Sequence, residues 1–336
     1  MINILFLIQD PYLPSSRYRV MQFLPRLEAE GIRCEAVPIP KGMMARRKLW
    51  ETLGNYDVIF LQKRMFRRGV VRRIRKNARA LIYDIDDAVM FNDSFKGHVR
   101  SRRREGRFAA MAGAADIVVV CNEYLARLAR VYAKDVRVFP TVVDLSRYVP
   151  PRESASRSDK TTLGWIGSGS TIRYLEALRP ALEEVGRRYK DAQLKLICDR
   201  FFDLENMPVI KAEWSEEAEI ADLFGIDIGL APAIDDPWFR GKSNLKVVQY
   251  LAARRAVVCA PVGAAREIVT DGETGLWARG PSEWIHRIGL LIEAPALRQR
   301  LGAAGRKVVE DTYSVDAVLP SFVKAIQDAA GRGKQS

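Results

Sequence analysis

The sequence has few of the side chains on which metal centres and disulfide frameworks depend. Among 336 residues there are only four cysteines and two histidines. The cysteines are far apart and mostly lie in or beside apolar runs, so we expect buried free thiols and neither disulfides nor a zinc site. Two histidines exclude a polyhistidine metal centre and argue against a Ser-His-Asp triad.

Long apolar runs are missing as well. None reaches the ~20 residues that span a bilayer, and the chain leads from Met1 directly into a strand-like run without the basic segment of a signal peptide. We therefore expect a cytoplasmic protein that binds peripherally to the inner face of the cytoplasmic membrane. The content of 48% hydrophobic and 28% charged residues is that of a globular protein, and the length suits two domains.

The formal net charge of +13 is larger than solubility requires, and it indicates an anionic partner. Two basic runs of the first half, residues 63–79 and 100–107, carry most of the excess. Nucleic acid, anionic lipid and anionic substrates are the candidates. No DNA-binding signature or aromatic-interleaved platform accompanies the runs, so we expect docking on an anionic membrane surface and no nucleic-acid partner. A merely solvated helix face is the alternative.

Strand-like runs alternate with helical patterns from end to end, which predicts an α/β fold with parallel sheets and helices on both faces. In the first half the expected strands cover residues 2–8, 33–37, 58–61, 80–83, 117–121 and 136–139. The helices between them are expected to begin near Ser16, Met43, Phe66, Ser94 and Glu123. In the second half the expected strands cover 162–166, 194–197, 226–230, 256–259 and 275–277, and three helices follow at 282–292, 295–311 and 315–329.

A polar stretch rich in proline and serine, residues 151–160, separates the two series and is typical of an interdomain linker. We expect an N-terminal domain over residues 1–150 and a C-terminal domain over 161–314. The last helix, residues 315–330, is expected to pack back on the first domain.

The segment from Gly241 to Ala252 is the most informative part of the chain. A basic helix that starts with glycine behind a buried strand is where an open α/β sheet binds a phosphorylated ligand. Lys242 and Lys246 are four residues apart and would share a helix face, which Tyr250 continues. Tyr250 could then stack on a base or a ribose. A surface helix with solvated lysines is the alternative.

A glycine- and serine-rich turn closes the first strand of the second half. It consists of Gly167, Ser168, Gly169, Ser170 and Thr171. The glycines let the backbone approach a ligand, oriented N–H groups could hold a diphosphate, and Ser170 or Thr171 could cap a helix that runs to about residue 189. The turn lacks the spacing of a dinucleotide fingerprint and the lysine of a P-loop. A tight turn that uses glycine for its geometry is the alternative.

The matching loop of the first half carries Ser15, Ser16 and Arg17. The serines would bind a ligand hydroxyl or phosphate, with Arg17 or Arg19 beside them, because loops at this sheet edge carry function. Capping of the next helix by the serines is the alternative.

Three carboxylates, Asp84, Asp86 and Asp87, end the fourth strand. Such crowding requires relief by a cation, an arginine or a sugar hydroxyl network. We expect them to bind sugar hydroxyls or to orient an acceptor, with helix capping by Asp87 as the alternative. An Asp-x-Asp pair is common by chance, so we expect no metal site.

A second candidate ligand loop precedes the lysine segment. It carries Asp235, Asp236 and Arg240, a mixture that suits a ligand-facing loop, although an ordinary turn remains possible.

With these segments in view, the chain resembles the GT-B glycosyltransferases, specifically family 4. The resemblance covers nearly the whole length. It is strongest over residues 227–232, 241–252, 257–263 and 267–276. It implies two Rossmann-like domains that face a central cleft, with a nucleotide-sugar donor in the second and a glycan or lipid-linked acceptor in the first. It also implies sugar transfer with retention, in cell-surface polysaccharide or glycolipid synthesis, without a cofactor; Mg²⁺ is not expected.

In this resemblance the enzyme stabilises the leaving diphosphate, a task that suits Lys242, Lys246, Arg240 and the turn at residues 167–171. Ser243 and Asn244, in the same segment, join the expected donor site. Asp86 stands near the position of a histidine that is frequent in the family, and we count it with the two lysines as a catalytic candidate.

The chain departs from the family pattern at several positions. The usual pair of glutamates, seven positions apart, falls on Lys242 and Gln249. Gln249 can still hydrogen-bond ribose hydroxyls, whereas Lys242 cannot accept a hydrogen bond from a sugar. Asp235 or Asp236 would then take that role.

Two further departures concern the turns. The arginine of the first turn of the second domain is Ser168, and the Gly-Gly of the first loop is Ser15-Ser16. A catalytically inactive GT-B-like scaffold protein and a basic nucleic-acid-binding α/β protein are therefore the alternative functions.

Overall fold

The computed structural model describes residues 1–150 and 159–333, so most of the predicted linker lies outside the described residues. Backbone contacts divide the chain into two units. The first comprises Met1–Val142, Asp236–Ser243 and Val315–Ser336, and the second comprises Val143–Asp235 and Asn244–Ser314. The division thus comes at Val142, earlier than the expected limit at residue 150, and Val143 forms a bridge with Ser314 of the second unit.

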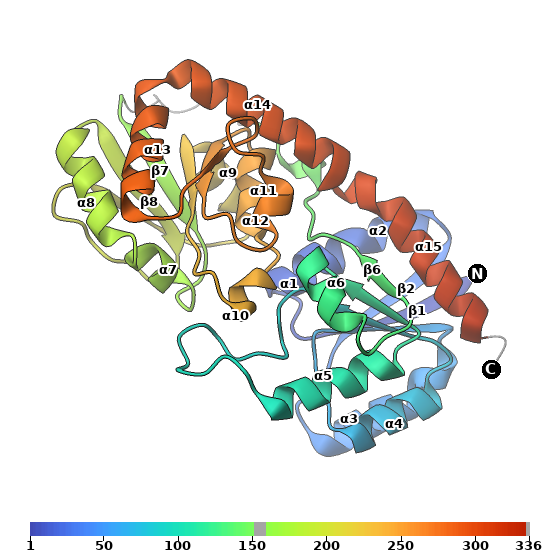
Figure 1. Cartoon of the computed structure of the whole chain (residues 1–336). Coiled ribbons are helices and arrows are strands. Elements are labelled where there is room, and N and C mark those ends of the chain that lie inside the picture. Colours follow the sequence, from blue (N-terminus) through green and yellow to red (C-terminus); the bar gives the residue numbers. More distant parts are fainter. Residues whose placement is uncertain (151–158, 334–336) are drawn as a thin grey trace. The chain divides into compact units, whose positions relative to one another are not determined.

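The first unit contains a six-stranded sheet in the order β2-β1-β3-β4-β5-β6, in which every neighbouring pair is parallel (Figure 1). The strands are β1 (Ile2–Ile8), β2 (Ile32–Pro38), β3 (Val58–Gln62), β4 (Leu81–Ile85), β5 (Ile117–Val120) and β6 (Val136–Val138). All six were predicted within a few residues; β1, β3, β4 and β5 are continuous apolar runs, as strands buried on both faces require, whereas β2 and β6 at the edges are less buried.

Helices cover both faces of this sheet. They are α1 (Pro14–Arg19), α2 (Leu24–Ala29), α3 (Met43–Thr52), α4 (Arg68–Asn77), α5 (Arg102–Ala114), α6 (Glu123–Ala129), the single turn α10 (Pro237–Arg240) and α15 (Val315–Gly333). Alternate strand residues face the two layers: Leu5 and Leu7 pack with α3 to α6, whereas Ile4 and Phe6 pack with α2 and α15. In the second layer the ring of Phe322 on α15 lies among four other phenylalanine rings.

The second unit contains another six-stranded parallel sheet, in the order β12-β11-β10-β7-β8-β9. Its strands are β7 (Thr161–Ile166), β8 (Ala192–Cys198), β9 (Val209–Glu213), β10 (Ile228–Ala231), β11 (Ala256–Cys259) and β12 (Leu276–Trp277). Its helices are α7 (Ile172–Glu176), α8 (Arg179–Arg188), α9 (Glu219–Phe224), α11 (Leu245–Ala252), α12 (Ala265–Ile268), α13 (Pro281–Glu293) and α14 (Pro295–Thr312). The predicted α/β class is confirmed.

Several local predictions were wrong. β9 was missed. The helix expected near Ser94 begins at Arg102, because Asp93 accepts a hydrogen bond from the backbone N–H of Phe95 and closes a turn there. The helix expected from Ser170 or Thr171 to residue 189 is divided into α7 and α8, and no side chain caps α7. No helix among the described residues is long and apolar enough to cross a membrane.

The expected glycine-started helix also differs from the structure. Asp236 caps the separate turn α10, with Pro237 in its first position, and the next helix, α11, begins only at Leu245. Asn244 precedes α11 in a left-handed conformation, with φ of 52°. Lys242 is therefore not helical, and it does not share a helix face with Lys246.

Candidate functional site

Each sheet has one place where the strand order reverses direction. In the first sheet β1 lies between β2 and β3, and in the second sheet β7 lies between β8 and β10. At such a place the connections leave the sheet on opposite sides, and the loops at the carboxyl ends of the strands leave room for a ligand. The turn at residues 167–171 follows β7, and the loop with Ser15 and Ser16 follows β1.

The turn after β7 is held together by its own hydrogen bonds. Ser168 N–H donates to Thr171 Oγ1 at 3.3 Å, and Thr171 N–H donates back to the carbonyl of Ser168 at 2.8 Å. Gly169 N–H donates to the carboxylate of Asp199, which follows β8. These N–H groups already have acceptors, so the side-chain hydroxyls are among the groups that this turn can offer to a ligand. Ser168 Oγ and Ser170 Oγ lie 2.8 Å apart.

Neighbouring side chains pack directly against the backbone at Gly167 and Gly169, so neither position has room for a Cβ atom. A Cβ atom on Gly167 would lie 2.4 Å from the ring of Trp165, and one on Gly169 would lie 2.4 Å from Cδ of Arg200. The sequence analysis missed Arg200. It is exposed, and its aliphatic stem lies against the turn.

Lys246 lies beside the same turn. Its ammonium group is 4.1 Å from the ring centroid of Trp165, the ring that Gly167 accommodates. Trp165 is completely buried at the end of β7. A cation against an aromatic face is stabilised by the ring quadrupole. Lys246 and the turn are thus brought together within the second unit, as a phosphate site requires.

Tyr250 has a structural role. Its side chain is fully buried, and its hydroxyl accepts the N–H of Ile166 at 3.0 Å and donates to the carbonyl of Leu230 at 3.4 Å. A Cβ on Gly229 would lie 2.4 Å from the ring. The expectation that Tyr250 stacks on a base or a ribose was wrong, because the ring is enclosed between α11 and the sheet.

Gln249 lies in a buried polar group of the second unit. Its Nε2 donates to Glu219 Oε1 at 3.0 Å, and Trp214 Nε1 donates to the same oxygen at 3.3 Å. Glu219 and Gln249 are each 3% exposed. Because a carboxylate only accepts, Glu219 fixes the amide of Gln249 with its nitrogen toward the acid. A carboxyl group therefore lies beside Gln249, although neither family glutamate position carries an acid.

The residues between β10 and α11 are divided between the two units. Asp236 Oδ1 accepts the N–H of Phe239 at 2.7 Å, so this side chain is a helix cap. Asp235 is exposed. Arg240 ends α10, with its carbonyl hydrogen-bonded to Asn122 Nδ2 at 3.2 Å.

The last two residues before α11 are more enclosed. Ser243 is half-buried. Asn244 Nδ2 donates to the carbonyl of Val262 at 3.3 Å in the second unit. The predicted donor residues of this segment are therefore divided between the units, since Asp236–Ser243 belongs to the first.

The loop after β1 encloses Ser16 and leaves Ser15 half-buried. Ser16 is completely buried, and its hydroxyl donates to Gln62 Oε1 at 3.0 Å. Gln62 Nε2 donates in turn to the carbonyl of Ser15 at 2.8 Å. Arg17 is 7% exposed and lies against the ring of Tyr18. The predicted ligand role of Ser16 is corrected, because its hydroxyl joins α1 to the end of β3.

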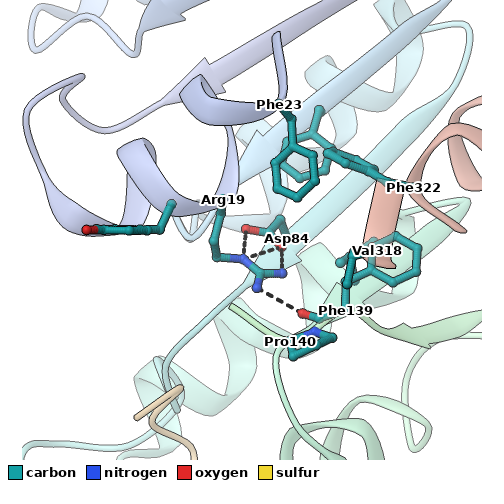
Figure 2. Close-up of a pocket in the computed structure, with 10 residues that line it drawn as sticks. Arg19, Phe23, Asp84, Phe139, Pro140, Val318 and Phe322 are labelled. Atoms are coloured by element: carbon teal, nitrogen blue, oxygen red, sulfur yellow. Dashed lines mark hydrogen bonds and ion pairs between the residues drawn. The ribbon is translucent and has the colours of Figure 1, made fainter. Parts of the chain in front are cut away.

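Asp84 also has a structural partner. Both of its oxygens accept from Arg19 Nε at 2.9 Å, and Arg19 Nη1 donates to the carbonyl of Phe139 at 2.9 Å (Figure 2). Burial acts to lower the pKa of Arg19, but the ion pair with Asp84 outweighs it and raises the pKa above its ordinary value. Asp84 is 0% exposed. The expectation that it contacts an acceptor is corrected.

The cavity at this ion pair is small. It has a volume of about 10 Å³, the lower limit for a single water molecule, and phenylalanine rings form much of its wall (Figure 2). It has no room for a sugar.

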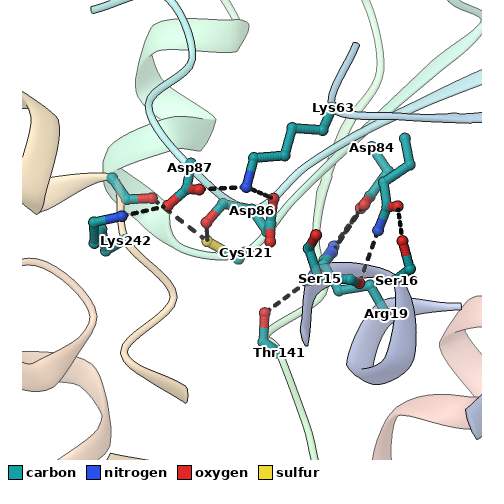
Figure 3. A network of polar contacts seen from close by, with 12 residues as sticks. Ser15, Ser16, Arg19, Lys63, Asp84, Asp86, Asp87, Cys121, Thr141 and Lys242 are labelled. Atoms are coloured by element: carbon teal, nitrogen blue, oxygen red, sulfur yellow. Dashed lines mark hydrogen bonds and ion pairs between the residues drawn. The ribbon is translucent and has the colours of Figure 1, made fainter. Parts of the chain in front are cut away.

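Asp86 and Asp87 form a charged network with two lysines (Figure 3). Lys63 Nζ lies 3.1 Å from Asp86 Oδ1 and also binds Asp87, while Lys242 Nζ lies 3.1 Å from Asp87 Oδ1. Lys63 has a left-handed backbone, with φ of 57°, at the end of β3. Sparsely populated backbone conformations of this kind cluster at functional sites.

The charges of this network stabilise one another. Burial alone would raise the pKa of Asp87, but the charges of Lys242 and Lys63, with their hydrogen bonds, outweigh it and lower the pKa to about 2. The pKa of Lys63 is raised by Asp86 and Asp87, although burial opposes the shift. Asp87 therefore remains ionised, and it caps no helix. Among residues 1–150 and 159–333, no group of three metal-binding side chains could hold a metal ion.

The sequence analysis missed the roles of Gln62, Lys63, Asp199 and Glu219. Lys63 was seen only as the start of a basic run. Its left-handed conformation and its pairing with two aspartates leave no local signature. Asp199 does have a signal, since it directly follows a buried strand at the edge where ligands bind.

Solved structures of other proteins have a similar fold. No protein-family model matches the chain, and no curated protein matches it. Among solved structures, sucrose-phosphate synthase from Thermosynechococcus elongatus superposes with a TM-score of 0.77 at 16% identity, over 98% of this chain and 99% of that one. A glycosyltransferase from Rickettsia africae gives a TM-score of 0.75 at 11% identity, over 98% of both chains.

The chain has the GT-B fold. Anabaena HepE, solved in complex with UDP and glucose, has a TM-score of 0.71 at 16% identity and covers 98% of this chain and 100% of its own. The GT-B prediction is confirmed by these structures. At such identities they establish the fold alone, so family 4 and the roles of individual residues stay predictions.

Proposed function

We propose that this GT-B protein is a glycosyltransferase that moves a sugar from a nucleotide-sugar donor to a glycan or lipid-linked acceptor. The proximity of Lys246 to the turn at residues 167–171 is the observation on which the proposal rests. The two meet on Trp165 at the place where the strand order of the second sheet reverses. A cation and hydroxyl groups at the carboxyl ends of parallel strands are well suited to bind a diphosphate. HepE, of the same fold, was solved with UDP and glucose.

In this proposal the second unit binds the donor. Lys246 and Arg200 lie against the leaving diphosphate, and the hydroxyls of Ser168 and Ser170 donate to its oxygens. In this proposal Gln249, which is hydrogen-bonded to Glu219, binds the ribose, as the family resemblance implies. The protein supplies electrostatic stabilisation as negative charge develops on the leaving group, and no metal ion is needed for that task.

The first unit binds the acceptor in this proposal. Asp86, at the carboxyl end of β4, is the acid that orients the acceptor hydroxyl. Lys242 pairs with Asp87 and keeps the charged network in place, so its role in this proposal is to position the network. Transfer with retention and a role in cell-surface polysaccharide or glycolipid synthesis complete the proposal and follow from the family resemblance. Nuclear magnetic resonance of the product tests the retention, and an inverted product would contradict it.

Calorimetric titration of UDP-, GDP- and ADP-sugars into the protein tests the donor site. We expect one of these donors to bind and Lys246→Ala to weaken binding about 10- to 100-fold, because a hydrogen bond to a charged group contributes about 1.5–3 kcal/mol. Lys307→Ala removes an exposed lysine from α14 of the same unit and is the matched control. Equal losses in the two variants would reject the site.

Turnover separates an enzyme from the alternative, a scaffold protein that keeps the fold without catalysis. Lys242 motivates this alternative, because a lysine bound to Asp87 occupies a position at which the family carries a glutamate. If the protein binds the donor but neither transfers the sugar nor hydrolyses the donor slowly, the scaffold is favoured. Sugar transfer or donor hydrolysis that Lys246→Ala diminishes would exclude it.

A further inference from the structure

Three neighbouring helices of the first unit begin at one edge of its sheet. α3, α4 and α5 each end a few residues before the next parallel strand starts, so their N-termini lie at the opposite, carboxyl edge. α4 contacts both α3 and α5 (Figure 1). The ring of Trp50 on α3 is 5.4 Å from that of Phe66, which precedes α4. The three N-termini therefore lie at the same edge of the sheet and together define one surface of the first unit.

This surface is strongly cationic. α3 and α4 have no acidic residue in their first turns, so the positive ends of their dipoles add to the side-chain charges. Within residues 1–150 and 159–333, the following basic side chains of α4, α5 and the residue before α4 form no ion pair: Arg67, Arg68, Arg72, Arg73, Arg102 and Arg103. Slight burial and the charges of Arg103 and Arg67 lower the pKa of Arg107, so α4 and α5 bring like charges together.

Two large apolar side chains lie at the end of the same surface. Met43 and Met44 occupy the first two positions of α3 and are 86% and 79% exposed. Arg47 and Lys48 follow on the same helix and are exposed too. Flexible methionines adapt to irregular apolar environments. Exposed apolar side chains bordered by cations are typical of helices that lie in the interface of a bilayer.

We propose that the N-terminal ends of α3, α4 and α5 form a docking surface for an anionic lipid bilayer, into which Met43 and Met44 insert. The arginines bind the lipid phosphates, and the methionines enter the boundary with the acyl chains. This inference adds α3 and its methionines to the basic runs of the sequence. It does not depend on the proposed transferase.

The composition of the surface favours lipid over nucleic acid. Proteins that bind single strands present aromatic rings for the bases. Trp50, Phe66 and Phe108 are only 3%, 6% and 1% exposed, and they pack in the core below the helices. The exposed methionines are apolar and would not bind the phosphates of a nucleic acid, whereas a bilayer would bury them.

Flotation with phosphatidylcholine vesicles, with and without phosphatidylglycerol, tests the proposal. We expect binding only to vesicles that contain phosphatidylglycerol, and release at high salt. Arg68→Glu/Arg72→Glu reverses two cations on one face of α4 and should weaken binding at least about 30-fold, since each basic residue near such a surface contributes about a factor of five. Met43→Ser/Met44→Ser should weaken binding about tenfold or more on the same vesicles.

Matched substitutions in the second unit are the controls. Arg266→Glu/Arg300→Glu makes the same change of charge, and Ile210→Ser removes an exposed apolar side chain of that unit. Both should bind vesicles like the unchanged protein. Equal losses in controls and test variants would overturn the proposal.

Two further results would overturn it. One is no binding to anionic vesicles. The other is retardation of RNA or DNA at the same salt, abolished by Arg68→Glu/Arg72→Glu, without vesicle binding. Donor titration of each variant keeps this test separate from the proposed enzyme, because we expect unchanged donor affinity in all of them.

Discussion

Asp87 provides the most quantitative test of the charged network in the first unit. Its carboxylate binds Lys63 and Lys242, and its side chain is 17% exposed. These cations lower its pKa from 3.8 to about 2. At 1.36 kcal/mol for each pKa unit, the ionised form contributes about 2 kcal/mol to folding at neutral pH. Asp87→Asn should therefore make exchange of the β4 amides about 30-fold faster at pH 7.

The pH dependence has a defined sign. Because the folded pKa is depressed, the stabilisation by Asp87 is fully present above its unfolded pKa of 3.8 and is lost as the pH falls toward about 2. In calorimetry the unchanged protein and Asp87→Asn should differ by a constant amount above about pH 5 and converge as the pH falls through this range.

Glu184→Gln is the matched control. Glu184 also binds two basic side chains, Arg187 and Arg188, but these are 55% and 56% exposed, and ion pairs with such exposed partners contribute little. We expect a much smaller change in stability. If the two variants were equal, or if the deficit of Asp87→Asn stayed constant down to the lowest pH, charge pairing would not be the source of the stabilisation.

Two further perturbations test the first unit by urea unfolding. Arg19→Met should cost about 3–5 kcal/mol by leaving Asp84 buried without its partner, and Arg19→Met/Asp84→Leu should recover part of that loss; a double variant as unstable as the sum of both single variants would contradict the pairing. Gly241→Ala should cost about 1–3 kcal/mol, because its Cβ would lie 2.5 Å from that of Ala88. Gly69→Ala is its control: no atom lies within 4 Å of that Cβ, so equal losses would refute the steric explanation.

The sequence was sufficient for the fold, since nearly all strands are apolar runs closed by polar turns. The missed strand explains the limit: β9 lies at the edge of its sheet beside β8, and its burial pattern, with three exposed positions of five, lacks the apolar run that marks the central strands. The lysine helix was misplaced because the sequence was read as one helix from Gly241. The cap by Asp236 and the left-handed Asn244 interrupt it.

The sequence predicted which loops form the candidate site, but it predicted only some of the contacts between their side chains. Loops at the carboxyl ends of strands were found from the alternating pattern alone, and Lys246 and the turn at residues 167–171 do meet. The pairing of Asp87 with Lys242 joins positions far apart in the chain, and no local pattern specifies it. Ser16 and Asp84 were misread because their partners, Gln62 and Arg19, are set by packing.

Release of nucleoside diphosphate from UDP-, GDP- and ADP-sugars, measured for the unchanged protein and for Lys246→Ala, tests the central claim most directly. We expect one donor to be consumed by the unchanged protein and its consumption to fall at least about tenfold in the variant. No release from any donor would contradict the proposed transferase, and the same rate in both proteins would contradict a diphosphate site at Lys246.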